Sequence, residues 1–384
     1  MNNKERIIAQ IKGEEVDNIP IIGGWSLGVK NMAELGGISV EEYLKEPENS
    51  VIEINKKLGV SGMVQYIVPK DIDAIRDGDL QEETFNDVEP EVILERAEKI
   101  PDNERDIIKS KVNYDLMYKK YYDYIGDMQA KMGDICYIIT DWYVPVTFSL
   151  YFSYGYIAFL SGAALYPESL EKIWWEDSII KREHNYAMLN VIRDLDMVPI
   201  IFTGDDICNN SGPMINPDFL HENFWPHNKR ALEPLVENGI RLIHHCDGNV
   251  MPIVDDMVAA GYSGFQGFQY ECGVDIYDLR KRKSLLGEEM IIMGGLSVTR
   301  TLPYGTKEDV INEVNYSVDA TDNGRGLFLF TSNVTGVEMP PKNLITAYDY
   351  LKSNDWKNSN RSKVVSPPAL NVPIKLDMPD RFSV

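Results

Sequence analysis

Eight short apolar stretches recur along the chain, and each is followed by sequence that is compatible with a helix. They span residues 19–24, 63–68, 136–141, 198–204, 240–246, 262–268, 290–295 and 326–332. Several are almost continuously apolar and β-branched or aromatic, such as Ile-Ile-Phe-Thr and Leu-Phe-Leu-Phe-Thr, which is typical of parallel strands buried on both faces. Strand–helix alternation repeated eight times predicts an α/β fold of the closed (β/α)8 or TIM barrel class. The alternative is an open doubly wound sheet, but no glycine-rich phosphate fingerprint follows the first stretch.

Two segments depart from this alternation. Residues 71–133 are long, acidic and then rich in Tyr and Lys, which predicts a helical insertion after the second strand. Residues 354–384 are Ser/Asn-rich and then Pro-rich. We expect residues 1–353 to form a single barrel domain and 354–384 an extended C-terminal tail that either wraps the body or contacts a second subunit in a homodimer.

Composition excludes several classes of protein. The 384 residues are 44% hydrophobic, and the formal net charge of −22 opposes binding to nucleic-acid phosphates and to anionic lipid surfaces. No apolar run approaches the roughly 18 residues that a membrane span needs, and the N-terminus lacks a secretory apolar core. Four scattered cysteines do not form a disulfide framework. We therefore expect a cytoplasmic enzyme.

The sharpest local signal follows the fifth stretch, where His244, His245, Cys246 and Asp247 are consecutive. Residues two apart on a strand share a face, so either His244 with Cys246 or His245 with Asp247 can supply two metal ligands. Imidazole with thiolate or carboxylate suits zinc, and Glu271, after the next strand, is a candidate third ligand. The competing interpretation is that one histidine packs in the barrel while Cys246 fills the core as a small apolar side chain.

Asp205 and Asp206 follow the fourth stretch and are the candidate catalytic acids or bases. Active sites of this barrel class lie at the carboxyl ends of the strands, where adjacent carboxylates repel each other and burial can raise a pKa. The alternative is that one of them caps a helix or turn.

Aromatic and amide side chains at the same ends of other strands predict an apolar substrate pocket. The candidate substrate-binding residues are Trp25, Tyr66, Trp142, Tyr143 and Asn333. For any single aromatic residue among them, core packing is the competing interpretation. The apolar stretch 148–159 suggests a lid or a helix at the barrel mouth.

Several blocks of the chain resemble the uroporphyrinogen decarboxylase-like superfamily. The longest are residues 204–232, beginning GDDICNNSGPMINP, and residues 239–266, beginning GIRLIHHCDGN. Residues 19–28, 293–314 and 339–352 resemble it as well, so the resemblance runs from about residue 3 to residue 353. It implies a (β/α)8 barrel, in agreement with the strand pattern.

The resemblance admits two chemistries. Uroporphyrinogen decarboxylases carry an N-terminal arginine motif that grips substrate carboxylates, whereas residues 23–28 here are Gly-Gly-Trp-Ser-Leu-Gly. Arginine is the residue suited to bidentate carboxylate binding, so its absence argues against a porphyrinogen substrate. The other branch comprises zinc methyltransferases that exchange methyl groups with a corrinoid protein and carry a His-x-Cys-Gly-Asn motif.

This chain matches that motif imperfectly. An alignment without a gap places His245 and Asp247 on the family's histidine and cysteine, and one inserted residue places His244 and Cys246 there instead. The family's later cysteine has Ser332 or Asn333 in its place. A harder His/Asp/Glu site suits polarisation of an ether oxygen better than activation of a thiolate.

The resemblance therefore implies a corrinoid-dependent methyltransferase of the O-demethylase type. Its expected substrate is an aromatic methyl ether, its expected cofactor is zinc, and its expected partner is a corrinoid protein. The alternatives are transfer from methylcorrinoid to a thiol, a decarboxylase with another substrate, and a non-enzymatic binding module.

Overall fold

Parallel strand segments form the centre of the molecule. The computed structural model describes residues 1–384 except 27, 72–87, 338, 359–366 and 374–384. The strands are β1 (Ile22–Gly23), β2 (Gly62–Met63), β3 (Cys136–Tyr137), β4 (Ile139–Thr140), β5 (Ile200–Gly204), β8 (Arg241–His245), β9 (Gly264–Gln266), β10 (Ile291–Leu296) and β11 (Leu327–Thr331). Each of the eight predicted stretches overlaps one of these strands, with β3 and β4 sharing the third, although β2 meets its stretch only at Met63 and β10 runs one residue past its stretch. A short antiparallel pair, β6 (Cys208–Asn209) and β7 (Gly212–Pro213), was not predicted.

The parallel pairing runs round a ring. One sheet has the order β1-β2-β3 and the other β11-β10-β9-β8-β5-β4, and β3 and β4 are consecutive in the chain. Ile21, just before β1, forms a parallel bridge with Leu329 of β11 and so joins the far edges. The chain thus has an α/β fold with a curled parallel sheet of the TIM barrel kind.

The interior of the ring is apolar. Side chains that alternate along the strands, such as Ile200, Phe202 and Ile243, form one buried cluster. Ile7 and Ile11 of the first helix belong to the same cluster, so this helix covers the amino-terminal end of the ring. The carboxyl ends of the strands are left as the mouth.

The helices cover the outside of the ring. The α-helices are α1 (Asn3–Ile11), α2 (Val29–Gly36), α3 (Val40–Lys45), α4 (Pro47–Leu58), α5 (Glu91–Glu98), α6 (Glu104–Lys111), α7 (Tyr114–Met132), α8 (Tyr151–Tyr154), α9 (Tyr156–Leu165), α10 (Pro167–Asp194), α11 (Pro217–Asn223), α12 (Trp225–Val236), α13 (Val254–Ala260), α14 (Ile276–Leu279), α15 (Thr301–Tyr304), α16 (Lys307–Ala320), α17 (Pro341–Ser353) and α18 (Asp355–Asn358). The 3-10 helices are η1 (Met251–Ile253), η2 (Tyr270–Cys272) and η3 (Pro368–Asn371). Helices α10 and α11 begin at Pro167 and Pro217, because a proline at the first helical position loses no hydrogen bond.

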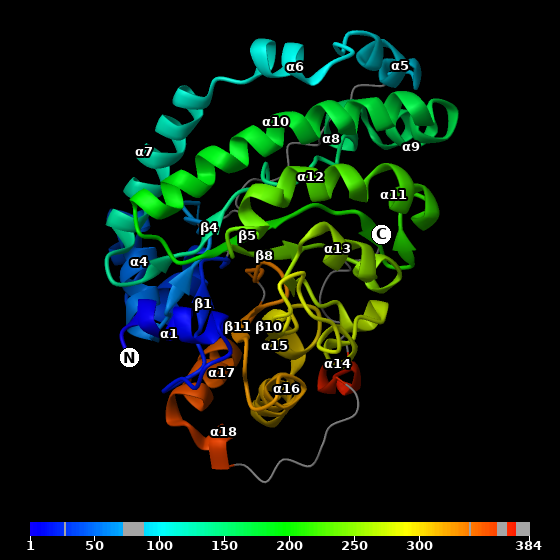
Figure 1. Cartoon of the computed structure of the whole chain (residues 1–384). Coiled ribbons are helices and arrows are strands. Elements are labelled where there is room, and N and C mark those ends of the chain that lie inside the picture. The colour runs from blue at the N-terminus through cyan, green and yellow to red at the C-terminus, as the bar shows by residue number, and fades with distance from the viewer. Residues whose placement is uncertain (27, 72–87, 338, 359–366, 374–384) are drawn as a thin grey trace.

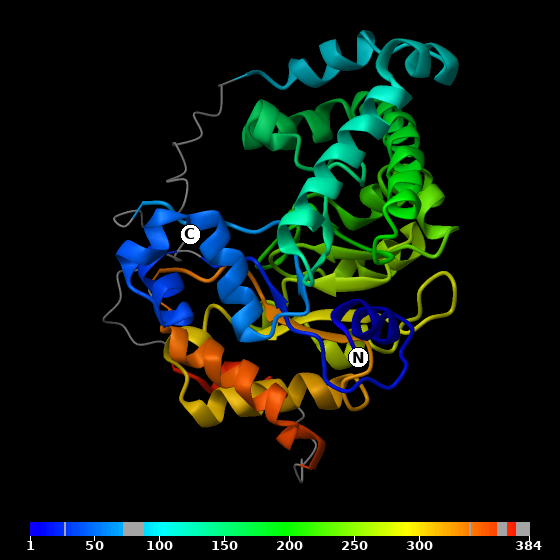
Figure 2. The same cartoon turned by 90° about the vertical axis from the view of Figure 1, so that its left-hand side faces the viewer.

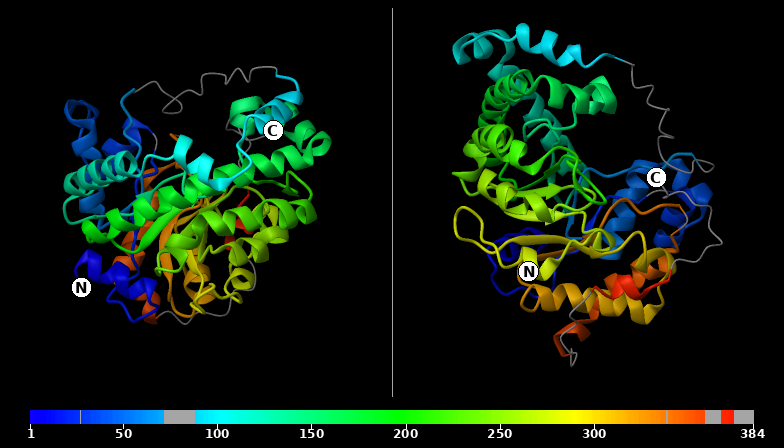
Figure 3. Two further views of the ribbon diagram at one scale, coloured as in Figure 1. Left: turned by 45° about the horizontal axis from the view of Figure 1, so that its top comes forward. Right: turned by 90° about the vertical axis from the view of Figure 1, so that its right-hand side faces the viewer.

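The helices form layers on either side of the strands. Figure 1 shows α10 and α12 on one side and α16 and α17 on the other. Helices α5, α6 and α7 form a further arc and contact the outer side of α10. Figure 2 shows α2, α3 and α4 beside the strands, and Figure 3 shows the same layers from two other directions.

The two segments that depart from the alternation are partly described. Helices α5, α6 and α7 lie within the predicted insertion at 71–133, of which residues 72–87 are outside the described residues. The tail, 354–384, contributes α18 and η3, and η3 packs against α16 and η2. A homodimer contact through the tail stays a prediction. Across the described residues, every helix is too short or too polar to cross a membrane.

Candidate metal centre

Strand β8 presents alternate side chains to the two sides of the ring. Ile243 belongs to the interior cluster, and His245, two residues on, lies against the interior ring of Phe202 with their centroids 6.2 Å apart. Leu242 and Cys246 belong instead to the cluster between strands and helices. The structure therefore brings His245, and not His244, to the mouth.

The other pair of the sequence cluster lies outside the ring. The ring of His244 packs on that of Tyr262, with centroids 4.5 Å apart, and burial lowers the pKa of His244 to about 3. Burial also raises the pKa of the Cys246 thiol well above its ordinary value. Neither His244 nor Cys246 belongs to the group of described residues with metal-binding spacing. Cys246 packs in the apolar layer, which is the role that the alternative interpretation gave to it.

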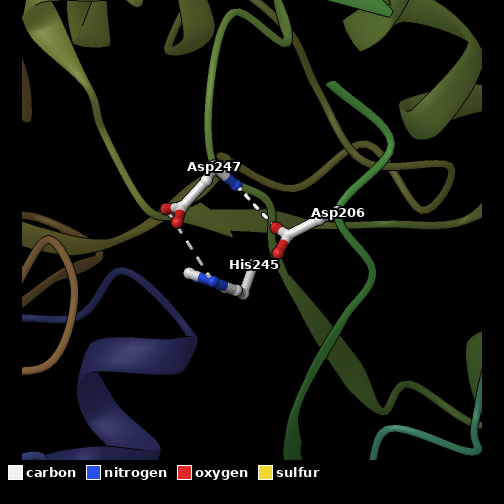
Figure 4. A group of neighbouring side chains, drawn as sticks. All are labelled: Asp206, His245 and Asp247. Atoms are coloured by element: carbon white, nitrogen blue, oxygen red, sulfur yellow. Dashed lines mark hydrogen bonds and ion pairs between the residues drawn. The ribbon is translucent and has the colours of Figure 1, made fainter. Parts of the chain in front are cut away.

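Three side chains converge at the mouth. One ligand atom each from Asp206, His245 and Asp247 lies within 4.8 Å of the others, and this is the group of His, Cys, Asp and Glu found among the described residues with metal-binding spacing. His245 Nε2 is 3.9 Å from Asp247 Oδ1. Figure 4 shows the two carboxylates and the imidazole pointing toward one another, with His245 at the end of β8, Asp247 just after it and Asp206 in the loop after β5. The side chain of Asp247 is 34% exposed, so the group is open to solvent.

The close approach of β5 and β8 depends on Gly204. A Cβ at this position would lie 2.2 Å from the carbonyl oxygen of His245. Just beyond the ends of the two strands, the backbone amide of Asp247 donates a hydrogen bond to Asp206 Oδ1 at 3.0 Å. This bond links the two strand ends and holds both carboxylates at the same place.

The neighbouring candidates Asp205 and Asp206 have different surroundings. Asp205 accepts hydrogen bonds from the backbone amides of Phe148 and Ser149 at 2.7 and 3.0 Å, and burial raises its pKa to about 6. It therefore anchors the segment that leads into α8. The hydroxyl of Tyr151, on α8, donates to the carbonyl of Asp206. The apolar stretch 148–159, expected to be a lid or mouth helix, forms α8 and the start of α9 and is tied to this strand end.

Asn333, which the sequence suggests as a substrate contact, is hydrogen-bonded to Asp247. Its Nδ2 donates to Asp247 Oδ1 at 3.1 Å and to Oδ2 at 2.8 Å. Its Oδ1 accepts from the amide of Val334 at 2.6 Å, which fixes the direction of the side-chain amide. Burial raises the pKa of Asp247, while the nearby His245 opposes that shift.

Glu271 does not join the group, and Asp206 takes the place expected for it. Glu271 is exposed on η2, and its Oε1 accepts a hydrogen bond from Thr299 Oγ1 at 2.9 Å. Its charge still acts on Asp247, whose pKa it raises slightly. Glu271 therefore lies at the rim, outside the convergent group.

Aromatic rings surround His245. Trp25 and Trp142 lie 5.5 and 6.0 Å from it between ring centroids, both edge to face, and are stacked on each other at 6.4 Å. Phe202 and Phe330 complete the wall against Trp25. The two phenylalanines are the residues that sequence reasoning missed, although their alternation on β5 and β11 places them on the inner face.

The other two aromatic candidates are held elsewhere. The hydroxyl of Tyr66 donates to Glu48 of α4 at 2.7 Å. Tyr143 is 67% exposed, and Lys181 Nζ lies 4.6 Å from the centroid of its ring. The structure thus brings Trp25 and Trp142 to the candidate centre, and leaves Tyr66 and Tyr143 in other contacts.

Comparison with known proteins adds two findings. The family model described as uroporphyrinogen decarboxylase (URO-D) matches residues 200–353, from β5 to the end of α17. A solved structure named "methyltransferase from Methanosarcina mazei" is similar with a TM-score of 0.58 and 16% sequence identity, covering 92% of this chain and 99% of that chain. At this identity the likeness shows the fold. No curated protein matches the sequence. The two findings support the resemblance to the uroporphyrinogen decarboxylase-like superfamily.

Proposed function

We propose that the chain is a zinc methyltransferase that removes the methyl group of an aromatic methyl ether and passes it to the corrinoid of a partner protein. The observation that carries the proposal is the convergence of Asp206, His245 and Asp247 beside Trp25 and Trp142. The structurally similar chain from Methanosarcina mazei is named a methyltransferase, which supports methyl transfer as the type of reaction.

The side chains fit a zinc ion. One imidazole and two carboxylates are ligands that zinc accepts, and three protein ligands leave a fourth position for a substrate atom. No cysteine belongs to the group among the described residues, since Cys246 faces the helix layer. Oxygen-rich ligands favour an oxygen substrate over a thiolate, which supports the ether over the thiol alternative. Bound there, zinc supplies a Lewis acid for the ether oxygen.

The residues of the chain bind and orient the rest of the substrate. The rings of Trp25 and Trp142, which are stacked on each other and lie edge to face with His245, offer apolar contact to an arene beside the convergent group. Trp25 is buried and Trp142 is exposed, so Trp142 is the ring that is accessible to an incoming arene. In the proposed reaction the methyl–oxygen bond would break with its electron pair staying on the phenolate, and the methyl group would pass to the reduced corrinoid of the partner protein as the acceptor.

Adjacent histidines provide a matched test of the metal site. His245→Phe removes a proposed ligand, whereas His244→Phe replaces a ring that packs on Tyr262 outside the mouth. We expect the His244→Phe protein to retain one zinc per chain after chelator treatment and reloading, measured by elemental analysis, and the His245→Phe protein to lose it. Equal zinc content in both folded variants would remove His245 from the site.

Activity is tested on the metal-free and zinc-loaded wild-type protein with methoxyphenols as donors and reduced free cobalamin as acceptor. The expected result is methylcobalamin formation that depends on zinc. Unchanged transfer by the metal-free protein would contradict the role of zinc, and release of carbon dioxide from a carboxylated substrate without any corrinoid would favour the decarboxylase.

A further inference from the structure

Gln266, at the end of β9, is a buried polar residue that is hydrogen-bonded to His245. The two residues are paired in register across β8 and β9. Gln266 is 3% exposed, and its Nε2 donates to the carbonyl oxygens of Thr331 and Ser332 at 2.8 and 3.0 Å. Both protons of the amide are therefore directed at the end of β11, and the opposite atom of the amide, Oε1, is hydrogen-bonded to His245 Nδ1.

This arrangement fixes the role of each ring nitrogen. An amide oxygen only accepts hydrogen bonds, so His245 Nδ1 must carry the proton. A neutral imidazole has one N–H, and its other nitrogen, Nε2, then keeps a lone pair. Nε2 is the atom that lies 3.9 Å from Asp247 Oδ1, within the convergent group.

We infer that Gln266 is a positioning residue that holds His245 in the tautomer with a free Nε2, the form that a metal ligand requires. The reason for this tautomer rests on the proposed function, in which Nε2 binds zinc. The tautomer itself follows from the hydrogen bonds and does not depend on any metal. A reversed amide would set two N–H groups against His245 and one oxygen against two carbonyl oxygens. The carbonyls of β11 thus select the histidine tautomer on β8 through one side chain.

Gly267 keeps the contact close. Its φ of +109° belongs to a region that favours glycine, and a Cβ there would lie 3.3 Å from His245 Nδ1 and 2.7 Å from the carbonyl of Cys246. The backbone therefore turns away immediately after Gln266. This leaves the amide and the imidazole in contact without an intervening side chain.

Two variants of Gln266 distinguish the effect of its hydrogen-bond acceptor from the effect of its side-chain size. Gln266→Met has a similar length but neither accepts from Nδ1–H nor donates to β11, and Gln266→Glu keeps an acceptor oxygen. The matched control is Asn185→Leu, which removes a buried amide whose Nδ2 donates to the carbonyls of Val144 and Ala231. The control thus loses two hydrogen bonds to backbone carbonyls, as Gln266→Met does. Among the described hydrogen bonds, Asn185 has none to a histidine.

The first readout is the tautomer of His245 in metal-free protein at mildly alkaline pH, from long-range nitrogen–proton NMR correlations of labelled histidine. The chain has five histidines, and the His245→Phe protein identifies the signal. We expect a protonated Nδ1 in wild type, in Gln266→Glu and in Asn185→Leu, and a shift toward protonated Nε2 in Gln266→Met. A protonated Nδ1 in folded Gln266→Met protein, or a protonated Nε2 in wild type, would overturn the inference.

The second readout is zinc affinity by competition with a chelator. Loss of a hydrogen-bond partner of a metal-bound histidine lowers affinity by roughly 10- to 100-fold, which is the expected effect of Gln266→Met. Asn185→Leu is expected to keep the wild-type affinity, and an equal loss in that control would reduce Gln266 to a structural role. If the tautomer depends on Gln266 while the wild-type protein binds no zinc, the inference about Gln266 holds and the proposed function fails.

Discussion

The buried carboxyl group of Glu313 gives a prediction with a defined size. Glu313, on α16, is fully buried, and its Oε1 accepts a hydrogen bond from the amide of Ser297 at 3.0 Å. Burial raises its pKa from the ordinary 4.5 to about 8. Through its hydrogen bond to Ser297, the Glu313 carboxyl group holds the loop after β10. Thr299 of the same loop donates a hydrogen bond to Glu271 at the rim. We predict that Glu313→Gln changes how stability depends on pH.

The sign follows from proton binding. A raised pKa in the folded state means that, between about pH 4.5 and pH 8, the folded protein binds one more proton than the unfolded chain. Wild-type stability then falls as pH rises through this window, by at most about 1.4 kcal/mol per pH unit and roughly 5 kcal/mol in all. The side-chain amide of the Glu313→Gln variant cannot ionise, so the variant lacks this loss and gains on wild type until the pH passes about 8.

The assay is urea denaturation of both proteins from about pH 5 to about pH 9, with the difference in unfolding free energy as the readout. Glu308→Gln, at an exposed residue on the same helix, is the control for the loss of one carboxylate from α16. A constant difference between wild type and Glu313→Gln would refute the reasoning, because it would mean that Glu313 ionises at the same pH in both states.

Three further outcomes are expected. Asn333→Leu removes the amide that binds both oxygens of Asp247, so zinc affinity by chelator competition should fall roughly 10-fold or more, and an unchanged affinity would contradict that role. Trp142→Leu removes a ring beside His245, so the KM for an aromatic ether should rise several-fold for about 1 kcal/mol of lost stacking; a change in kcat alone would argue against arene binding. Gly204→Ala sets a Cβ against the His245 carbonyl and should cost about 3 kcal/mol in thermal denaturation, whereas an unchanged Tm would show that β5 can move away.

The strands were predictable because a strand that is buried on both faces needs an apolar residue at nearly every position, and the sequence therefore shows nearly continuous apolar stretches. That same property hid the orientation of β8. Leu242 and Ile243 are both fully buried, one outside the ring and one inside, so the apolar pattern gives no face to His244 or His245. Spacing established that alternate residues pair, but the curvature of the sheet decides which pair faces the mouth.

The third member of the candidate group could not be chosen from the sequence for a related reason. Asp206 and Glu271 both follow strands, and their reach depends on the loop. Asp206 is turned inward by its bond to the amide of Asp247, whereas Glu271 sits on η2 and bonds Thr299. The sequence pointed to Asn333 because it follows a predicted strand, but it did not reveal that Asn333 binds Asp247. A hydrogen bond between residues that are far apart in the chain leaves no local sequence pattern.

The bridge between Ile21 and Leu329 has a consequence for how the protein is made. On the ribosome, the first strand pairs early with β2, but its other neighbour, β11, emerges more than 300 residues later, so an incomplete ring persists through most of translation. During that time the edge of β1 and the inner face of the strands are exposed. Slow folding and dependence on chaperones are therefore expected until the last strand arrives.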